Sequence, residues 1–124
     1  MADLMKGKRG LVMGVANERS IAWGIASALA AEGAELAFSY QGEAFGKRVE
    51  PLAASVGSDF LVDVDVTNDE SLDACFAALK SRWGTMDFLI HAIAFSDKNE
   101  LKGRFINTTR GTFQTSLTIS CFSF

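Results

Sequence analysis

The sequence contains few of the residues that mark metal-binding or disulfide-rich proteins. Its 124 residues include one proline, one tyrosine, one histidine and two cysteines. Cys75 and Cys121 lack metal-ligand spacing, and such a pair usually indicates core thiols inside cells rather than a disulfide or a metal site. His91, the only histidine, lies in an apolar run that predicts a buried strand, so we assign it no catalytic role.

Long apolar runs and runs of basic residues are also missing. The start of the chain shows no secretory signal and no stretch is long enough to anchor it in a membrane, which predicts a cytoplasmic protein without a membrane partner. The formal net charge of -3 argues against a nucleic-acid partner. With 48% hydrophobic and 22% charged residues, the chain is expected to form one globular domain, 1–124, that binds a small molecule.

Apolar runs alternate with amphipathic segments four times along the chain. The runs that predict strands are 9–15, 34–40, 59–64 and 87–93, and the segments that predict helices are 20–32, 43–56 and 67–83. The end of the chain, 108–124, is compatible with a helix or a strand, and we favour a helix. Short connections between such elements are typical of a parallel sheet with helices on both faces. We therefore predict an α/β fold, the first half of a Rossmann-like doubly wound sheet with strand order 3-2-1-4. On this view the chain is an incomplete dinucleotide-binding domain, truncated before a fifth strand.

Local signals refine three of the helices. The first helix is expected to bury an apolar face made of Ile21, Trp23, Ile25, Ala28, Leu29 and Ala31. Pro51 lacks a backbone donor, so it should either kink the helix 43–56 or open its main part. Thr67 and Glu70 resemble a capping box at the start of the third helix, with Thr67 as the N-cap.

The connection 14–24 joins the first strand to the first helix, where a pyrophosphate would meet free helix amides and the positive end of the helix dipole. Its glycines do not match the G-x-G-x-x-G pattern, because Glu18 and Ser20 stand where ordinary short-chain dehydrogenases carry glycine. Taken alone, the segment is equally compatible with a turn glycine, Gly14, followed by a serine N-cap.

Four segments at successive strand ends carry a family resemblance: 14–24, 39–41, 63–66 and 90–96. In this order they are similar to the amino-terminal portion of bacterial NADH-dependent enoyl-(acyl carrier protein) reductases, a divergent group of the short-chain dehydrogenase/reductase superfamily. The resemblance extends from about residue 5 to the end of the chain. Four motifs in register are far more specific than any one of them.

The resemblance implies positions for the cofactor, NADH. Gly14, Ser20 and Ile21 match positions around the pyrophosphate and the adjoining ribose, where they offer close backbone approach, a hydroxyl and helix amides. Gln41 matches the position at the adenosine ribose. Its neutral amide can bind a 2′-hydroxyl but offers no charge to a 2′-phosphate, which favours NADH over NADPH.

The remaining implied positions follow the third and fourth strands. Asp65 and Val66 match the adenine pocket, although Asp65 could instead be a solvated acid near a helix start. Ile93 matches the position by the nicotinamide and could also be ordinary core packing. Ser96 falls where the family has a small residue near the acyl substrate.

The activity implied by the resemblance is hydride transfer from NADH to the β-carbon of a trans-2-enoyl thioester carried by acyl carrier protein, in fatty acid biosynthesis. The family's catalytic tyrosine and lysine belong after a fifth strand, so we expect them beyond Phe124 and assign no catalytic residue to this chain. Members of the family are homotetramers, and this chain would lack most of the interface. We expect the isolated chain to have doubtful activity and to be prone to association.

Three alternatives remain open at this point. Another short-chain dehydrogenase, of the 3-ketoacyl reductase type, is disfavoured by Ser20 and by the sequence Ala-Ile-Ala at 92–94. A non-enzymatic receiver module would need acids at the end of the first strand, where this sequence has Gly14, Val15 and Ala16. A catalytically inactive NAD-binding fragment is the third.

Tyr40 and Lys47 have the spacing of a catalytic Tyr-Lys pair, but the end of the second strand is on the adenosine side, far from the nicotinamide.

Overall fold

A computed structural model describes residues 3–124 of the chain. The chain forms two compact units, one that ends at Ala92 and one that comprises Ile93–Phe124. We describe each unit by itself. The expectation of one domain over 1–124 stays a prediction.

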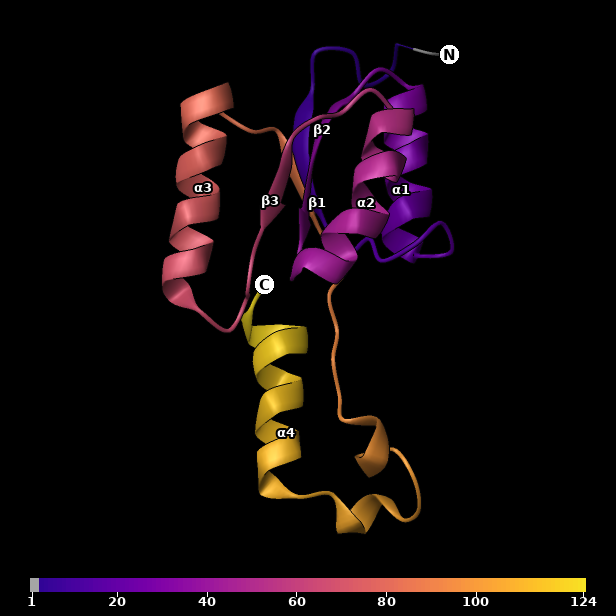
Figure 1. The fold of residues 1–124 in the computed structure, drawn as a ribbon, viewed down its shortest axis with the longest axis vertical. Helices are drawn as coiled ribbons and strands as arrows, with labels where there is room; N and C mark the ends of the chain where they lie inside the picture. Colours follow the sequence, from indigo (N-terminus) through magenta and orange to yellow (C-terminus); the bar gives the residue numbers. More distant parts are fainter. Residues whose placement is uncertain (1–2) are drawn as a thin grey trace. The chain divides into compact units, whose positions relative to one another are not determined.

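The first unit consists of four strands and three helices that alternate along the chain (Figure 1). They are β1 (Arg9–Met13), α1 (Ile21–Ala31), β2 (Glu35–Tyr40), α2 (Glu43–Ser55), β3 (Leu61–Asp63), α3 (Asp69–Trp83) and β4 (Phe88–His91). The strands pair in parallel in the order β3-β2-β1-β4. The predicted α/β, Rossmann-like arrangement and the strand order 3-2-1-4 are therefore confirmed.

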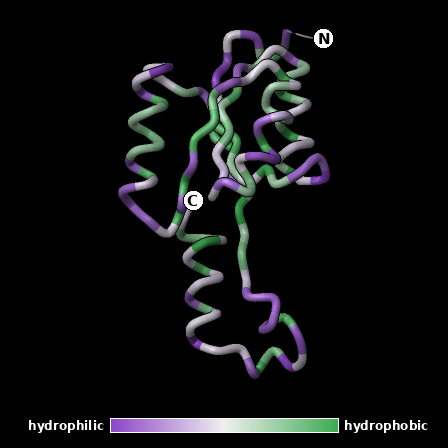
Figure 2. The backbone as a smooth tube through the Cα atoms, in the orientation of Figure 1, coloured by the Kyte–Doolittle hydropathy of each residue, from purple (hydrophilic) through white to green (hydrophobic). Residues whose placement is uncertain are grey.

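The sheet is covered on both faces. Helices α1 and α2 lie on one face and α3 lies on the other (Figure 1). The central strand β1 is buried from Gly10 to Met13, and the hydrophobic colour in Figure 2 runs through the sheet as well as parts of the helices. Two-sided burial explains why the strands are continuous apolar runs instead of alternating polar and apolar residues.

The core on the side of α1 and α2 is made of small helix residues against larger strand residues. It comprises Val12, Val15, Ala22, Ala26, Leu36, Phe38, Val49 and Ala53. The predicted face of α1 was partly wrong, because Ala22 and Ala26 are its buried residues and Ile21 is exposed. The small alanine side chains let the helix backbone approach the sheet closely. Ile21 is the first residue of the helix and its side chain is exposed.

Two local predictions are settled or corrected as well. Helix α2 runs as one element from Glu43 to Ser55 with Pro51 inside it, which excludes the alternative that Pro51 opens the main helix, while the kink stays a prediction. The N-cap of α3 is Asn68 and not Thr67, because the Asn68 side chain accepts hydrogen bonds from the amides of Glu70 and Ser71 at 2.9 and 3.3 Å. Asparagine is at least as good a cap as threonine.

The second unit contains short turns and one α-helix, which confirms the predicted helix near the end of the chain. Its elements are η1 (Lys98–Glu100), η2 (Phe105–Asn107), α4 (Arg110–Leu117) and the π-helical turn η3 (Thr118–Phe122). The Glu100 carboxylate accepts hydrogen bonds from the hydroxyls of Thr109 and Thr112, which lowers its pKa. This carboxylate therefore joins the turn η1 to the start of α4.

The two cysteines have different environments. Cys75 on α3 is buried, and burial raises the pKa of its thiol. Cys121 is exposed, so the expectation of two core thiols was wrong for this residue. Both thiols are free. No helix in the described range 3–124 has the length and apolar character needed to cross a membrane.

Phe38 is the largest side chain that is fully buried, with 0% of its surface exposed. Replacing Phe38 by alanine should lower the free energy of unfolding by about 3–5 kcal/mol, because a large cavity forms between the sheet and α1. Urea unfolding followed by circular dichroism measures this loss. Phe105, which is 89% exposed, provides the control, since F105A should cost less than about 0.5 kcal/mol. Equal losses in the two variants would contradict this assignment of the core.

Candidate functional site

The carboxyl ends of the four strands meet at one edge of the sheet. Met13 pairs with Ser39 and with His91, and Tyr40 pairs with Asp63, so the four strands end in nearly the same register. The loops that follow begin at Gly14, Gln41, Val64 and Ala92. In parallel α/β sheets this edge is where ligands bind.

Gly14 is required where β1 and β4 end side by side. Its φ of 114° favours glycine, and a Cβ atom added there would lie 2.1 Å from the carbonyl oxygen of Ala92. The Ala92 amide also donates to the Met13 carbonyl at 3.0 Å. Close packing of two strand ends therefore accounts for this glycine, and its predicted contact with a cofactor stays a prediction.

The Ser20 side chain organises the loop between β1 and α1. Its hydroxyl oxygen accepts hydrogen bonds from the amides of Ala16 and Asn17 at 2.9 and 3.1 Å. Ser20 occupies the N-cap position of α1, but its side chain does not cap the helix. A hydroxyl has two acceptor positions and one donor, so only its proton remains for another molecule. That molecule has to offer an acceptor, such as a phosphate oxygen or a sugar hydroxyl.

The first turn of α1 has further donors next to Ser20. Within residues 3–124, no hydrogen bond uses the backbone amides of Ile21 or Ala22. The amides of Trp23 and Gly24 are bonded to the Ser20 carbonyl at 3.0 and 3.2 Å. Two free amides at a helix N-terminus, where the helix dipole is positive, together with one hydroxyl donor form an arrangement suited to an anion.

Gln41 lies in the turn between β2 and α2. It is exposed, and the amide of Gly42, the next residue, donates to Oδ1 of Asp63 at 3.0 Å. The structure thus adds Asp63, to which the sequence analysis assigned no role. The predicted strand order already placed the third strand next to the second, so the acid at the end of the third strand could have been recognised as a neighbour of Gln41.

Asp65 is held by its own loop. Its Oδ1 accepts from the amide and the hydroxyl of Thr67 at 2.9 and 2.6 Å, and its amide donates to the Ser71 hydroxyl at 2.9 Å. The hydrogen bond from the Thr67 hydroxyl is the main reason that the pKa of Asp65 lies below its ordinary value. These bonds leave Oδ2 open to a ligand. Val66 is only 7% exposed, so it is first of all a core residue.

Ile93 and Ser96 belong to the second unit. Ile93 is half-buried and follows β4 by two residues. The Ser96 hydroxyl oxygen accepts from the Ser116 hydroxyl at 3.0 Å, and the Phe95 amide donates to the Ser120 hydroxyl at 3.0 Å. These bonds fasten the segment around Ser96 to α4 and η3.

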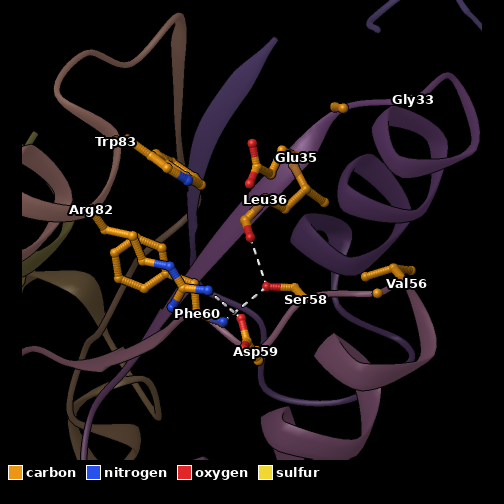
Figure 3. A pocket seen from close by; sticks show the side chains of 11 residues that line it. Gly33, Glu35, Leu36, Val56, Ser58, Asp59, Phe60, Arg82 and Trp83 are labelled. Atoms are coloured by element: carbon orange, nitrogen blue, oxygen red, sulfur yellow. Dashed lines mark hydrogen bonds and ion pairs between the residues drawn. The ribbon is translucent and has the colours of Figure 1, made fainter. Parts of the chain in front are cut away.

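A pocket of about 200 Å³ lies at the opposite, amino-terminal edge of the sheet (Figure 3). In it the Arg82 guanidinium pairs with Asp59 and lies 4.4 Å from the centre of the Phe60 ring. Phe60 also packs edge-on against Trp83 at 5.2 Å between ring centres. The contacts of Arg82 and Trp83 with Asp59 and Phe60 hold the end of α3 against the segment before β3. This pocket lies away from the carboxyl ends of the strands, so it does not extend the candidate site.

Comparison with known proteins gives the family. A family profile described as Enoyl-(Acyl carrier protein) reductase matches residues 14–124. The chain belongs to this enoyl-(acyl carrier protein) reductase family. The Rhizobium meliloti protein named enoyl-(acyl-carrier-protein) reductase (NADH) 2 is 65% identical over 124 residues, covering 100% of the chain and 46% of that relative.

Solved structures agree with this assignment to the enoyl-(acyl carrier protein) reductase family. FabI from Candidatus Liberibacter asiaticus is 56% identical and superposes with a TM-score of 0.97, over 99% of this chain and 48% of that one. The reductase from Anaplasma phagocytophilum, solved in complex with NAD, is 54% identical and superposes with a TM-score of 0.95, over 99% of this chain and 47% of that one. The chain thus spans about half the length of the relatives it matches.

The Thr67 hydroxyl bond predicts a specific change in the acidity of Asp65. Replacing Thr67 by valine should raise the pKa of Asp65 toward its ordinary value, because the bond to the hydroxyl is lost while the bond to the amide remains. Carbon-detected NMR titration of the carboxyl group measures this pKa, with Thr115→Val on α4 as the matched control.

The sign of the linked stability follows from the lowered pKa. The pKa of Asp65 is lower in the folded chain than in the unfolded chain. Its carboxylate therefore stabilises the fold at pH values above the unfolded pKa, and this stabilisation is lost as the pH falls through the folded pKa. T67V should therefore flatten the acid limb of the stability curve. An unchanged titration of Asp65 in T67V would show that the hydroxyl bond is not formed in solution.

Proposed function

We propose that the chain provides the cofactor-binding part of an NADH-dependent enoyl-(acyl carrier protein) reductase. The observation that carries the proposal is the donor set at the start of α1, where the Ser20 hydroxyl and the free amides of Ile21 and Ala22 follow the carboxyl end of β1. This donor set fits a pyrophosphate. The names of the relatives, which specify NADH, support the choice of dinucleotide.

In this proposal the residues of the first unit bind the adenosine half of the cofactor. Gly14 places the loop, Ser20 and Ile21 bind the pyrophosphate and the adjoining ribose, and the exposed Gln41 binds the adenosine ribose. A neutral amide at the ribose is compatible with a 2′-hydroxyl and gives no charge to a 2′-phosphate.

The adenine ring would meet Asp65 and Val66. Oδ2 of Asp65 can accept from the exocyclic amine, because Thr67 occupies only Oδ1. Val66 presents little surface, so we assign the ring contact mainly to its backbone and to the edge of its side chain. Ile93 would lie by the nicotinamide, and the segment at Ser96, which is fastened to α4, would lie by the acyl group.

The bound cofactor supplies hydride to the β-carbon of a trans-2-enoyl thioester. The substrate would be carried by acyl carrier protein, in fatty acid biosynthesis, and the enzyme would be a homotetramer in the cytoplasm. The two free thiols fit this compartment. The contribution of this chain to the chemistry would be to hold the cofactor and to place its nicotinamide end at β4.

The binding proposal is tested by titrating NADH into the 124-residue chain in a calorimeter. S20A should weaken NADH binding by about tenfold or more, because a hydrogen bond to a charged group is worth about 1.5–3 kcal/mol and the loop loses its anchor. Ser55→Ala on α2 is the matched control, since that hydroxyl donates to the Leu52 carbonyl of its own helix, away from the strand ends. Equal NADH affinities for S20A and the wild type would contradict the assignment.

Turnover should be separable from binding. The same polypeptide should bind NADH without oxidising it when a crotonyl thioester is added, because its one tyrosine, Tyr40, ends β2 and packs against Gly46. The loss of NADH absorbance measures the reaction. Turnover by the 124-residue chain would mean that another residue of the chain handles the proton.

A further inference from the structure

Asp63 is the last residue of β3, but its carboxylate serves the turn after β2. Oδ1 accepts a hydrogen bond from the Gly42 amide at 3.0 Å, and the main chains of Tyr40 and Val64 are joined by an amide-to-carbonyl bond of 2.7 Å. The carboxylate is exposed, and its Oδ2 is not engaged by the Gly42 bond. A negative charge is therefore fixed one residue beyond Gln41.

The basic side chains closest in sequence to this turn have partners on their own helix. Lys47 pairs with Glu43 at 3.6 Å, and the Arg48 guanidinium lies 5.8 Å from the centre of the Phe45 ring. Glu43 adds a second acid in the first turn of α2. Among residues 3–124 no ion pair compensates the charge of Asp63, whose hydrogen bond is to the backbone amide of Gly42.

In the usual dinucleotide-binding pattern, an acid about 20 residues after the glycine-rich turn bonds to the ribose 2′-hydroxyl and selects NAD. That acid would be expected where β2 ends, but here β2 ends in Tyr40, which is followed by the neutral Gln41. The neighbouring strand β3 brings a carboxylate to the same turn. The hydrogen bond to Gly42 holds it there.

We propose that Asp63 is a specificity-determining residue that disfavours NADPH at this site. The proposal rests on the cofactor-binding function proposed above. A 2′-phosphate brings a charge of about -1.5 to -2, and a fixed carboxylate at the ribose turn repels it. The 2′-hydroxyl of NADH is neutral and can donate to Oδ2. Gln41 favours NADH only by offering no positive charge to a 2′-phosphate, whereas Asp63 adds a repulsion of that phosphate.

The test compares dissociation constants for NADH and NADPH, measured by nucleotide fluorescence, in the wild-type chain and in Asp63→Asn. Asparagine keeps an oxygen for the Gly42 amide and removes the charge. NADPH binding should tighten by about fivefold to tenfold in D63N, while NADH binding changes by less than about twofold, as expected for charges several ångströms apart near a surface. The gain should shrink as salt is added, which a purely structural effect would not do.

Two further variants separate charge from structure. Asp59→Asn removes the same charge at the other end of the segment that forms β3, where Asp59 pairs with Arg82, and should leave the ratio of the two dissociation constants at its wild-type value. Asp63→Ala removes the charge and the anchor of the Gly42 turn, so both nucleotides should bind more weakly than to D63N. Circular dichroism verifies that each variant is folded.

The outcomes are distinct. If the ratio of the NADH and NADPH dissociation constants in D63N equals the ratio in the wild type and in D59N, the role of Asp63 is overturned, but the proposed cofactor site is not. A folded wild-type chain that binds neither nucleotide would reject the proposed function itself, and with it the role of Asp63. A gain for NADPH in D63N that is insensitive to salt would also overturn the proposal, because the mechanism is electrostatic.

Discussion

Parallel pairing of the four strands is the constraint on which the rest of the first unit depends. It requires each strand to be followed by a crossover, and it brings the four carboxyl ends to one edge. Residues that are far apart in sequence, such as Gly14, Gln41, Asp63 and Asp65, then lie at the same edge of the sheet. At this edge Gly14 lies so close to Ala92 that no space remains for a side chain.

Donors and acceptors at this edge are organised by short local bonds. Ser20 uses its acceptor positions on the loop before α1, and Thr67 occupies one oxygen of Asp65. In both cases the bond that shapes the loop also decides what the side chain has left to offer a ligand: a proton at Ser20 and an oxygen at Asp65. The local structure and the chemistry of the edge are therefore the same set of interactions.

Some sequence predictions were wrong where two local solutions compete. Thr67 satisfied the capping pattern, but its hydroxyl donates to Asp65, and Asn68 caps α3 instead. On α1, hydrophobicity alone placed Ile21 in the core, although the sheet is so close to the helix that alanines fill the contact. Patterns of residue type do not contain the distance between a helix and a sheet.

By itself the sequence determined the order of strands and helices, the fold class and the positions of the loops at the ligand edge, because apolar periodicity and glycine placement report backbone conformation directly. It also carried the motifs of the enoyl-(acyl carrier protein) reductase family. Only the tertiary structure decided which hydrogen-bonding positions of Ser20 and Asp65 are free, and that Asp63 bonds to Gly42, 21 residues earlier. The partner of Asp63 is chosen by the register of β2 and β3, which joins residues that no local pattern connects. The bonds of Ser20 and Asp65 are local, but residue type alone does not say which of several neighbouring amides and hydroxyls each oxygen will bond.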